Sequence, residues 1–336
     1  MNRREEAPHL PTQLYIEPTN RCNSKCNICV RTFYQYEKTK DLSFDEFKLI
    51  VDQFPNLKRV VLHGIGEPLL NADISEMVSY LKARNAYVLF NSNATLLDPE
   101  IQKGLIDAGL DEYRVSIDSA TPETYLKVRG VPLFDRVIDN LKGFVALQKS
   151  LQKQSPKISL WFVGEKENIA ELPDLIRLAK DIGIKEVYLQ RLTYFDGQKA
   201  RGLAKEELTI YQNPGEKVMQ IIEECESLAH DLKIAFRSSG ATTPKQSLIK
   251  RGKDEYPWQS CLRPWTLSYI TANGNALPCC ISPFSVEEYA DLILGNVFED
   301  KFGKIWNGKK YRSLRRRLLG PNPPQYCRGC GVKWSL

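Results

Sequence analysis

Short β-rich segments alternate with longer helical ones from Gln13 to about Leu192 of this chain. Such alternation is typical of βα units, whose strands assemble into a parallel sheet with helices packed on it. The segments with strand character span residues 14–17, 58–63, 87–90, 113–117, 158–163 and 186–192. Successive units of this length predict an α/β fold, a partial (β/α)6 barrel that stays open instead of closing with eight strands.

Helix boundaries in this region carry signals of their own. The hydroxyl of Ser43 can cap a helix, and Glu46 three residues later completes a capping box. Asp98 followed by Pro99 marks a second helix start. We also expect a long amphipathic helix over residues 134–151.

The composition is that of a globular protein with a full hydrophobic core. Of 336 residues, 42% are hydrophobic and 26% are charged, and no apolar run approaches the roughly 18 residues of a membrane span. The two arginines within residues 1–8 are not followed by the apolar stretch of a secretory signal. We therefore expect a cytoplasmic protein without a membrane anchor.

Positive charge is concentrated near the C-terminus. The formal net charge is +6, and residues 309–317 read Lys-Lys-Tyr-Arg-Ser-Leu-Arg-Arg-Arg, which would make a basic face on a helix. We expect a solvated edge there, with contact to an anionic substrate, a reductant protein or RNA as alternatives. Nucleic-acid binding has no other support, because the recurrent aromatic and basic pattern of base-stacking modules is absent from the sequence.

Three cysteines follow the first expected strand in one short loop. Cys22, Cys26 and Cys29 have the spacing C-x3-C-x2-C. A structural zinc or an ordinary [4Fe-4S] cluster takes four protein ligands. A loop that supplies three thiolates and stops would leave one iron open to another ligand. The chain has 9 cysteines and no secretory signal, so these thiols are expected to be ligands or catalysts, not disulfide partners.

Polar residues follow the next strands as well. Gly64 and Gly66 come directly after the second strand and would let backbone approach a ligand, while Glu67 suits a cationic amine. Asn91 and Asn93 follow the third strand and can bond a ribose. The carboxyl ends of parallel strands meet at one edge of a sheet, where ligands bind. The cysteine loop lies at that same edge.

This arrangement resembles the radical S-adenosylmethionine (SAM) superfamily, in which three such cysteines hold a [4Fe-4S] cluster and the open iron chelates SAM. The resemblance implies that Cys22, Cys26 and Cys29 are the cluster ligands. It further implies that reduction cleaves SAM to a 5'-deoxyadenosyl radical, which abstracts a hydrogen atom from a substrate. The expected partners are a small-molecule substrate and an external electron donor such as flavodoxin or ferredoxin.

The same resemblance assigns SAM contacts. Gly64, Gly66 and Glu67 look like the family's Gly-Gly-Glu motif, which holds the SAM amino group, although Ile65 intervenes. The residues similar to the family's ribose, carboxylate and adenine contacts are Asn91, Asn93, Ser116, Arg129, Gln190 and Leu192.

A second set of thiols lies near the C-terminus. Its four members are Cys261, Cys279, Cys327 and Cys330. An Asn273-Gly274 turn predicts a β-hairpin that returns Cys279 toward Cys261, and a helix expected over 301–319 carries the chain back to the other two. Four converging thiolates can hold zinc or an iron–sulfur cluster, and zinc is the commoner occupant of C-x2-C pairs in cytosolic proteins.

The C-terminal pattern resembles the SPASM/twitch extension of radical SAM enzymes. Gly274 before Cys279, the segment 294–297 and Cys327-Arg328-Gly329-Cys330 carry this resemblance. It implies one auxiliary [4Fe-4S] cluster held by four thiolates, which relays or accepts electrons. The expected division is a tail (1–12), a radical SAM core (13–195), a connecting region (196–257) and an auxiliary cluster domain (258–336).

Two cysteines remain outside these sets. Cys225 lies in a helical segment and is explained by packing. Cys280 neighbours Cys279 and could replace it as a ligand, or could return a hydrogen atom to a substrate radical.

The expected reaction is a two-electron oxidation at an unactivated C–H of a small hydroxylated substrate, such as a sugar or an aminocyclitol. The auxiliary cluster would accept the second electron. The alternatives are an epimerase that uses a cysteine as hydrogen-atom donor, a peptide-modifying enzyme, and a metal-binding scaffold or electron carrier without radical chemistry.

Overall fold

The computed structural model describes residues 3–195, 204–211, 213–240, 242–249, 255–285 and 289–330. Within these ranges the strands form one ten-stranded sheet in the order β10-β9-β8-β1-β2-β3-β4-β5-β6-β7. The parallel strands are β1 (Gln13–Ile16), β2 (Arg59–Leu62), β3 (Tyr87–Ser92), β4 (Glu112–Ser116), β5 (Lys157–Gly164), β6 (Glu186–Arg191), β7 (Ala235–Ser238) and β8 (Leu267–Ile270). The antiparallel strands are β9 (Asn275–Leu277) and β10 (Gly295–Asn296).

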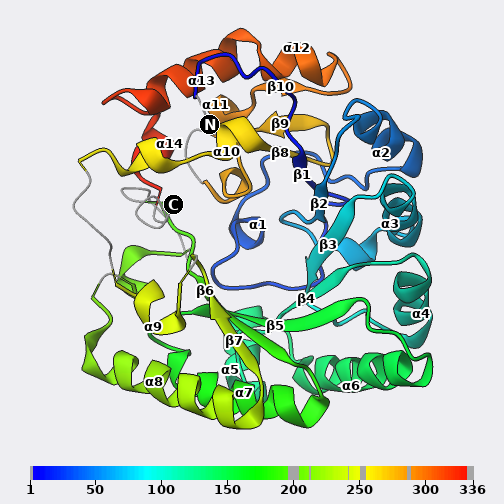
Figure 1. Cartoon of the computed structure of the whole chain (residues 1–336), viewed down its shortest axis with the longest axis vertical. Coiled ribbons are helices and arrows are strands. Elements are labelled where there is room, and N and C mark those ends of the chain that lie inside the picture. Colours follow the sequence, from blue (N-terminus) through cyan, green and yellow to red (C-terminus); the bar gives the residue numbers. More distant parts are fainter. Residues whose placement is uncertain are drawn as a thin grey trace.

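The sheet curves into an incomplete barrel, which confirms the predicted fold class. In Figure 1 the strands bend around the centre of the molecule, with α1 in the middle and most of the longer helices on the outside. Among the described strands β7 does not pair with β8, so the barrel is open at that point.

Helices cover the outer face of the sheet through apolar stripes. They are α2 (Phe44–Val51), α3 (Ile74–Lys82), α4 (Pro99–Asp107), α5 (Pro122–Arg129), α6 (Phe134–Ser150), α7 (Leu172–Ile182) and α8 (Gly215–Leu232). The short helix α1 (Val30–Phe33) lies instead at the centre of the barrel. The capping box before α2 is present, because Ser43 Oγ accepts from the Glu46 N–H and Glu46 accepts from the Ser43 N–H. On α6 the buried residues Val137, Leu141 and Phe144 recur at helical spacing and face the core.

The sequence did not reveal how the C-terminal hairpin joins the barrel. We expected β8 and β9 as part of an appended unit, but β8 also pairs in parallel with β1, with Leu267 opposite Gln13. The turn itself is as predicted, and Gly274 adopts a positive φ of 84° that suits glycine. The four-part domain division remains a prediction, and in the structure the parts 13–195 and 258–336 contribute strands to one sheet.

The remaining helices lie around this hairpin. They are α9 (Pro244–Ser247), α10 (Arg263–Thr266), α11 (Tyr289–Leu292), α12 (Phe302–Trp306), α13 (Lys309–Leu319) and α14 (Gln325–Arg328). The prediction of a single helix over 301–319 is wrong, because the helix is interrupted between α12 and α13. The break has a local cause: the Asn307 side chain exchanges hydrogen bonds with the backbone of Ala7, and Gly308 is extended with ψ of 169°.

The basic run on α13 is not a uniform solvated face. Arg315 is fully buried and donates to the carbonyl oxygens of Pro264 and Trp306, at 2.9 and 2.8 Å. Its guanidinium also lies over the Trp306 ring, 4.3 Å from the centroid. Arg316 is exposed and pairs with Glu5 in the N-terminal segment. Part of the charge that we assigned to a solvated edge therefore has a structural role.

Among the described residues, no helix has the length and apolar character needed to cross a bilayer.

Candidate functional site

The first cysteine loop lies between β1 and α1 and is held in place by α5. Lys25 N–H donates to the carbonyl of Arg129, and Asn27 N–H donates to that of Val128, both at 3.1 Å. All three thiols, of Cys22, Cys26 and Cys29, line one central cavity. The loop is thus fixed by backbone hydrogen bonds, which leaves the sulfur atoms available.

Burial and the charge of neighbouring thiols make two of these cysteines reluctant to ionise alone. Desolvation raises the pKa of Cys22 to about 11 and that of Cys29 to about 12, and the charge of Cys26 adds to both shifts. A cationic metal cluster supplies the positive charge that would stabilise three thiolates at this place. The donor set therefore fits an iron–sulfur cluster.

Next to the thiols stands a buried carboxylate. Glu67 is 2% exposed and accepts hydrogen bonds from Ser92 Oγ at 2.7 Å, Asn93 N–H at 2.7 Å and Leu69 N–H at 3.1 Å. Burial raises its pKa although these donors oppose the shift. A carboxylate with this cost of ionisation is well suited to a cationic ligand group.

The two glycines before Glu67 are needed for packing of the chain itself. A Cβ at Gly66 would lie 2.1 Å from the Thr19 carbonyl oxygen, and one at Gly64 would lie 2.2 Å from Glu17 Oε1. We expected room for a ligand here. The close neighbour is instead the segment that leads from β1 into the cysteine loop, so these glycines seat the loop against the Glu67 turn.

Arg129 connects the cysteine loop with the end of β4. It is buried, forms an ion pair with Asp118, and places Nη1 3.7 Å from Cys26 Sγ. Asp118 in turn accepts from Val163 N–H at 2.7 Å. Arg129 thus ties Cys26 through Asp118 to β5.

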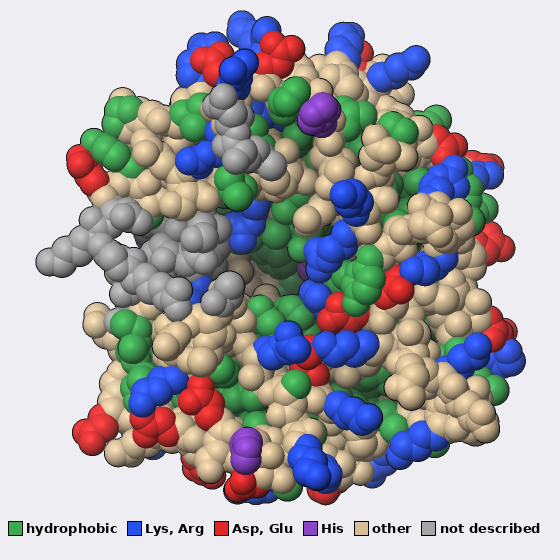
Figure 2. Space-filling model, in the orientation of Figure 1, with side chains coloured by type: hydrophobic (Ala, Val, Ile, Leu, Met, Phe, Trp, Pro, Cys, Tyr) green, Lys and Arg blue, Asp and Glu red, His purple; other side chains and the backbone are tan. Residues whose placement is uncertain are grey.

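The predicted SAM contacts line the same cavity as the three thiols. Its volume is about 690 Å³, within the usual size of small-molecule sites. The predicted residues that line it are Gly64, Gly66, Glu67, Asn91, Asn93, Ser116, Arg129, Gln190, Leu192 and Cys280. The side chain of Asn93 also donates to Asn23 and Ser24 of the cysteine loop. Figure 2 shows a hollow near the middle of the molecular face, with Lys and Arg side chains at its border.

The four thiols of the second set gather in a separate pocket. Cys261, Cys279, Cys327 and Cys330 line it together with apolar residues such as Leu292 and Leu318. The pKa of Cys327 is raised well above its ordinary value by burial and by the three other thiols. Cys280 does not line this pocket and lines the central cavity instead. The structure thus separates the two adjacent cysteines.

Within the described ranges no three Cys, His, Asp or Glu side chains are arranged to hold a single metal ion. Zinc needs its ligands within about 2.3 Å of one centre. A [4Fe-4S] cube instead meets each thiolate at a different iron, so its ligands stand farther apart. Four thiols that line one pocket suit either group by their donor chemistry.

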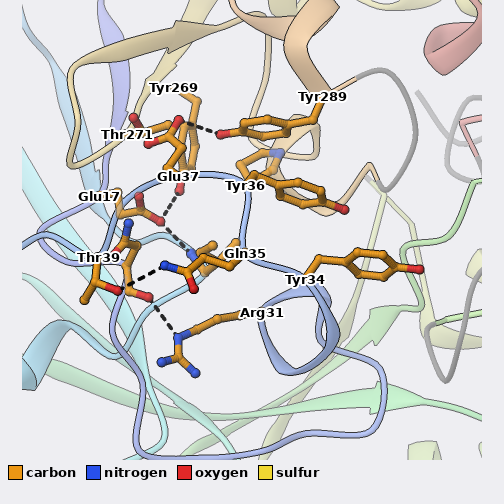
Figure 3. Close-up of a pocket in the computed structure, with 13 residues that line it drawn as sticks. Glu17, Arg31, Tyr34, Gln35, Tyr36, Glu37, Thr39, Tyr269, Thr271 and Tyr289 are labelled. Carbon is orange, nitrogen blue, oxygen red and sulfur yellow. Dashed lines mark hydrogen bonds between the residues drawn. The ribbon is translucent and has the colours of Figure 1, made fainter.

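A small pocket of about 100 Å³ marks the contact between the barrel and the C-terminal hairpin. Figure 3 shows Glu17 beneath Tyr269, and Glu37 bonded to Tyr289. Glu17 accepts from Ile65 N–H, Tyr269 Oη–H and Ala272 N–H at 2.9, 3.0 and 3.2 Å. Burial raises the pKa of Glu17 to about 7. Because Ile65 lies in the Gly64–Glu67 turn, Glu17 links that turn to β8.

Glu37 makes a second connection of the same kind. Its carboxylate accepts from the side chains of Asn273, Asn275 and Tyr289, at 2.9, 2.8 and 2.8 Å. All three donors belong to the C-terminal half of the chain. Two core carboxylates therefore hold the hairpin beside the cysteine loop.

Sequence reasoning missed several residues that line the central cavity. They are Tyr15, Arg59, His63, Arg114, Trp161, Tyr188 and Arg263. Most stand at inward positions of the strands, where polar or aromatic residues alternate with buried aliphatic ones, as in β4 and β5. That alternation was the available signal.

The site so defined belongs to an enzyme that combines SAM with an iron–sulfur cluster, and comparisons with known proteins agree. Residues 16–179 match the model of the radical SAM superfamily, and residues 261–331 match that of the SPASM iron–sulfur cluster-binding domain. The chain belongs to the radical SAM superfamily and carries a SPASM domain. Its cofactors are SAM, a [4Fe-4S] cluster and the additional iron–sulfur clusters of the SPASM domain.

Full-length similarity extends to proteins of several activities. The chain is 25% identical over 335 residues to the tungsten-containing aldehyde ferredoxin oxidoreductase cofactor-modifying protein of Pyrococcus furiosus, covering 95% of this chain and 87% of that protein. It is 25% identical over 335 residues to the AdoMet-dependent heme synthase of Methanosarcina barkeri, covering 96% and 88%. The fold is similar to that of Streptococcus suis SuiB bound to the precursor peptide SuiA, with a TM-score of 0.72, 17% identity and coverage of 98% and 72%.

Proposed function

We propose that this radical SAM enzyme oxidises an unactivated C–H of a substrate in the central cavity by two electrons. When bound, the cluster and SAM supply the 5'-deoxyadenosyl radical, and the auxiliary cluster supplies an electron acceptor. Cys22, Cys26 and Cys29 would hold the first cluster and Cys261, Cys279, Cys327 and Cys330 the second. Flavodoxin or ferredoxin, in the cytoplasm, is the proposed electron donor.

Other residues of the chain would prepare the cavity for this chemistry. Glu67 would bind the SAM amino group, because its carboxylate is buried and already held by three donors. Asn91, Ser116 and Gln190 would bond the nucleoside part from neighbouring strand ends. Arg129 is tied to Asp118 and would fix the position of Cys26 beside the cavity.

The observation that carries the oxidative proposal is the position of Arg263. This side chain lines both the central cavity and the pocket of the second thiol set, and it feels the charges of Cys279, Cys261 and Cys280. The central cavity and the pocket of the second thiol set therefore share a wall that includes Arg263 and Ile281. An electron that leaves a substrate radical in the cavity would pass through this wall to the auxiliary site.

Anaerobic reconstitution tests this proposal. With SAM and dithionite the enzyme should form 5'-deoxyadenosine, and each chain should carry about eight irons, four per cluster. Cys279→Ala should keep SAM cleavage but lose iron of the second set. No 5'-deoxyadenosine, or full iron content in Cys279→Ala, would contradict it.

Epimerisation is the second candidate, and the position of Cys280 favours it. Its thiol lines the central cavity opposite the first set's loop and lies beside Tyr15 and Arg263. In this reaction the S–H bond of Cys280 breaks as a new C–H bond forms on the substrate radical. The sulfur radical is then restored by one electron from the external donor and one proton. Solvent deuterium on the product carbon would support epimerisation, and a product two hydrogens lighter would support oxidation.

A peptide substrate is the third class that we propose to test. It is motivated by the similarity in fold to SuiB, whose structure contains the peptide SuiA. The same 5'-deoxyadenosine assay, run with candidate peptides, distinguishes it from a small-molecule substrate.

A further inference from the structure

The central cavity extends from the cysteine loop to the amino ends of several strands. Its lining includes the first residues of β2, β4, β5 and β6, which are Arg59, Glu112, Lys157 and Glu186. The thiols and the predicted SAM contacts lie at the opposite, carboxyl ends of the strands. A substrate can therefore occupy the amino-end half of the cavity while SAM occupies the other.

Positive charge exceeds negative charge in this amino-end half. Arg114 meets Glu112 with two hydrogen bonds of 3.0 Å each. Glu186 is shared by Lys157 and Arg237, at 2.6 and 3.1 Å. With Arg59 included, four cations face two carboxylates, so the net charge of these groups is +2, and Arg59 has no carboxylate partner in the described structure.

Arg114 is held rigidly and keeps a free donor. Its guanidinium lies 4.2 Å from the centroid of the Trp161 ring, which stacks on Tyr188 at 3.9 Å. Nε and Nη2 donate to Glu112, whereas Nη1 has no hydrogen-bond partner among the described side chains and backbone. A guanidinium fixed by stacking and a carboxylate loses little entropy when it binds an oxyanion.

His63 stands near Arg114 and has unused hydrogen-bonding capacity. Its Nδ1 is buried and lacks a partner in the described part of the chain. Burial and the charge of Arg114 lower the pKa of His63 to about 4, so the imidazole is neutral at pH 7. Arg59 lies four residues earlier on the same strand face, beside the Tyr15 hydroxyl. A buried imidazole without a partner indicates that a ligand completes this site.

We infer that the central cavity binds an oxyanion of the substrate, a carboxylate or a phosphate, through Arg59 and Arg114 of its amino-end half, with His63 at the carboxyl end of β2 bordering this site. This inference rests on the proposed function and narrows its substrate class. An anionic substrate is favoured over a neutral sugar or a cationic aminocyclitol, because the latter would face uncompensated positive charge. The rest of the substrate would extend toward the thiols.

Calorimetric titration of the reconstituted, SAM-bound enzyme under anaerobic conditions tests the inference. The probes are 3-phenylpropionate, phenyl phosphate and the neutral 3-phenylpropionamide. We expect each anion to bind at least about tenfold more tightly than the amide, since charge-assisted hydrogen bonds to fixed guanidinium groups contribute that much. The anion that binds more tightly identifies whether the site is built for a carboxylate or for a phosphate group of the substrate.

Two variants locate the binding. Arg59→Gln removes a charge that has no carboxylate partner in the described structure. Arg114→Lys keeps the charge but loses the paired N–H donors of the guanidinium group. Each should reduce the preference for anions to less than about threefold. Arg136→Gln, on the exposed face of α6, is the matched control and should keep the full preference.

Equal binding of the amide and the anions, or an unchanged preference in both variants, would overturn the inference. Absence of binding by all three probes would do the same. SAM affinity is measured in the same samples, so damage to the whole cavity is recognised as a parallel loss of SAM. The titrations measure binding without turnover. A failed titration with intact 5'-deoxyadenosine formation would therefore contradict this inference alone, and a successful titration without 5'-deoxyadenosine would contradict only the proposed function.

Discussion

The two sets of cysteines differ in the number of thiols, in the residues that line their pockets and in the chain segments that hold them. The first has three thiols in a large cavity that also contains the buried carboxylate Glu67 and the cation Arg129. The second has four thiols in a small pocket with mainly apolar neighbours such as Leu292 and Leu318. A polar cavity with a missing fourth thiol accommodates a further ligand, whereas an apolar pocket with four thiols encloses its cluster. Their surroundings thus fit a cluster that takes a further ligand at the first set and a fully ligated cluster at the second.

Their support differs as well. The first set lies on one loop that two backbone hydrogen bonds fix to α5. The second collects residues from the segment before α10, from the end of the β8–β9 hairpin and from α14. A local loop keeps its shape even if distant parts loosen. A centre assembled from three segments depends on the packing of the whole C-terminal half.

The largest expected effect is loss of the first centre. Cys26→Ala removes one of three ligands, so 5'-deoxyadenosine formation should be abolished and iron should fall by about four per chain. Cys225→Ala is the control, because this buried cysteine lies on α8 outside both sets. Chromatography of 5'-deoxyadenosine and an iron assay are the measurements. Retained SAM cleavage in Cys26→Ala would remove the distinction between the two centres.

The adjacent pair Cys279 and Cys280 tests the limits of the second centre. Cys279→Ala should lose iron of that centre, while Cys280→Ala should retain it, since only Cys279 lines the four-thiol pocket. Iron content and the low-temperature electron paramagnetic resonance of the reduced proteins report the difference. Equal iron loss in both variants would show that the two thiols exchange roles.

The packing that supports the second centre is expected to depend on Arg315. Arg315→Ala should lower the free energy of unfolding by about 3 kcal/mol, because buried carbonyl oxygens lose their charged donor. Arg316→Ala, one residue further on an exposed position, should leave it nearly unchanged. Chemical denaturation of both variants measures this. Equal effects would mean that the basic run acts only through its charge.

The contact between the two regions should be sensitive to pH through Glu17. Its pKa is about 7 in the folded protein and near 4.5 when unfolded, so the folded state holds the proton more tightly. This stabilisation is complete below pH 4.5 and is lost as pH rises through 7, by about 2.5 kcal/mol between pH 5 and pH 8. Denaturant titrations at several pH values should show a weaker dependence in Glu17→Gln. Parallel curves would exclude this role.

The smallest effect is expected for the charge of Glu67. Glu67→Gln keeps the shape but not the charge, so SAM should bind about tenfold more weakly, or about 1.4 kcal/mol. Glu76→Gln, exposed on α3, is the control. Calorimetric titration with SAM measures both, and iron content should stay constant. Unchanged affinity would show that the SAM amino group lies elsewhere.

Much of the barrel could be predicted because its signals are local. The capping box at Ser43 and the glycine turn at Gly274 depend on a few neighbouring residues, and both are present. The pairing of β8 with β1 joins residues far apart in sequence, and no local pattern encodes it. Burial of Arg315 was hidden for the same reason, since its partners Pro264 and Trp306 come from other elements.

The site shows the same division. The cysteine loop and the Gly64–Glu67 turn are contiguous motifs, and the structure brings them together around one cavity. Cys279 and Cys280 are neighbours in sequence but line different pockets. Only the direction of each side chain separates them, and spacing alone does not give that direction. Arg59, His63 and Arg114 come from two separate segments of the chain and line one cavity only in the folded barrel.

The pairing of β8 with β1 has a mechanical consequence. Four residue pairs, from Gln13 with Leu267 to Ile16 with Ile270, join the strand that enters the first cysteine loop to the strand that leads to Cys279. A hinge between the two metal centres would have to break this ladder. The relative position of the two cysteine sets is therefore set when the chain folds.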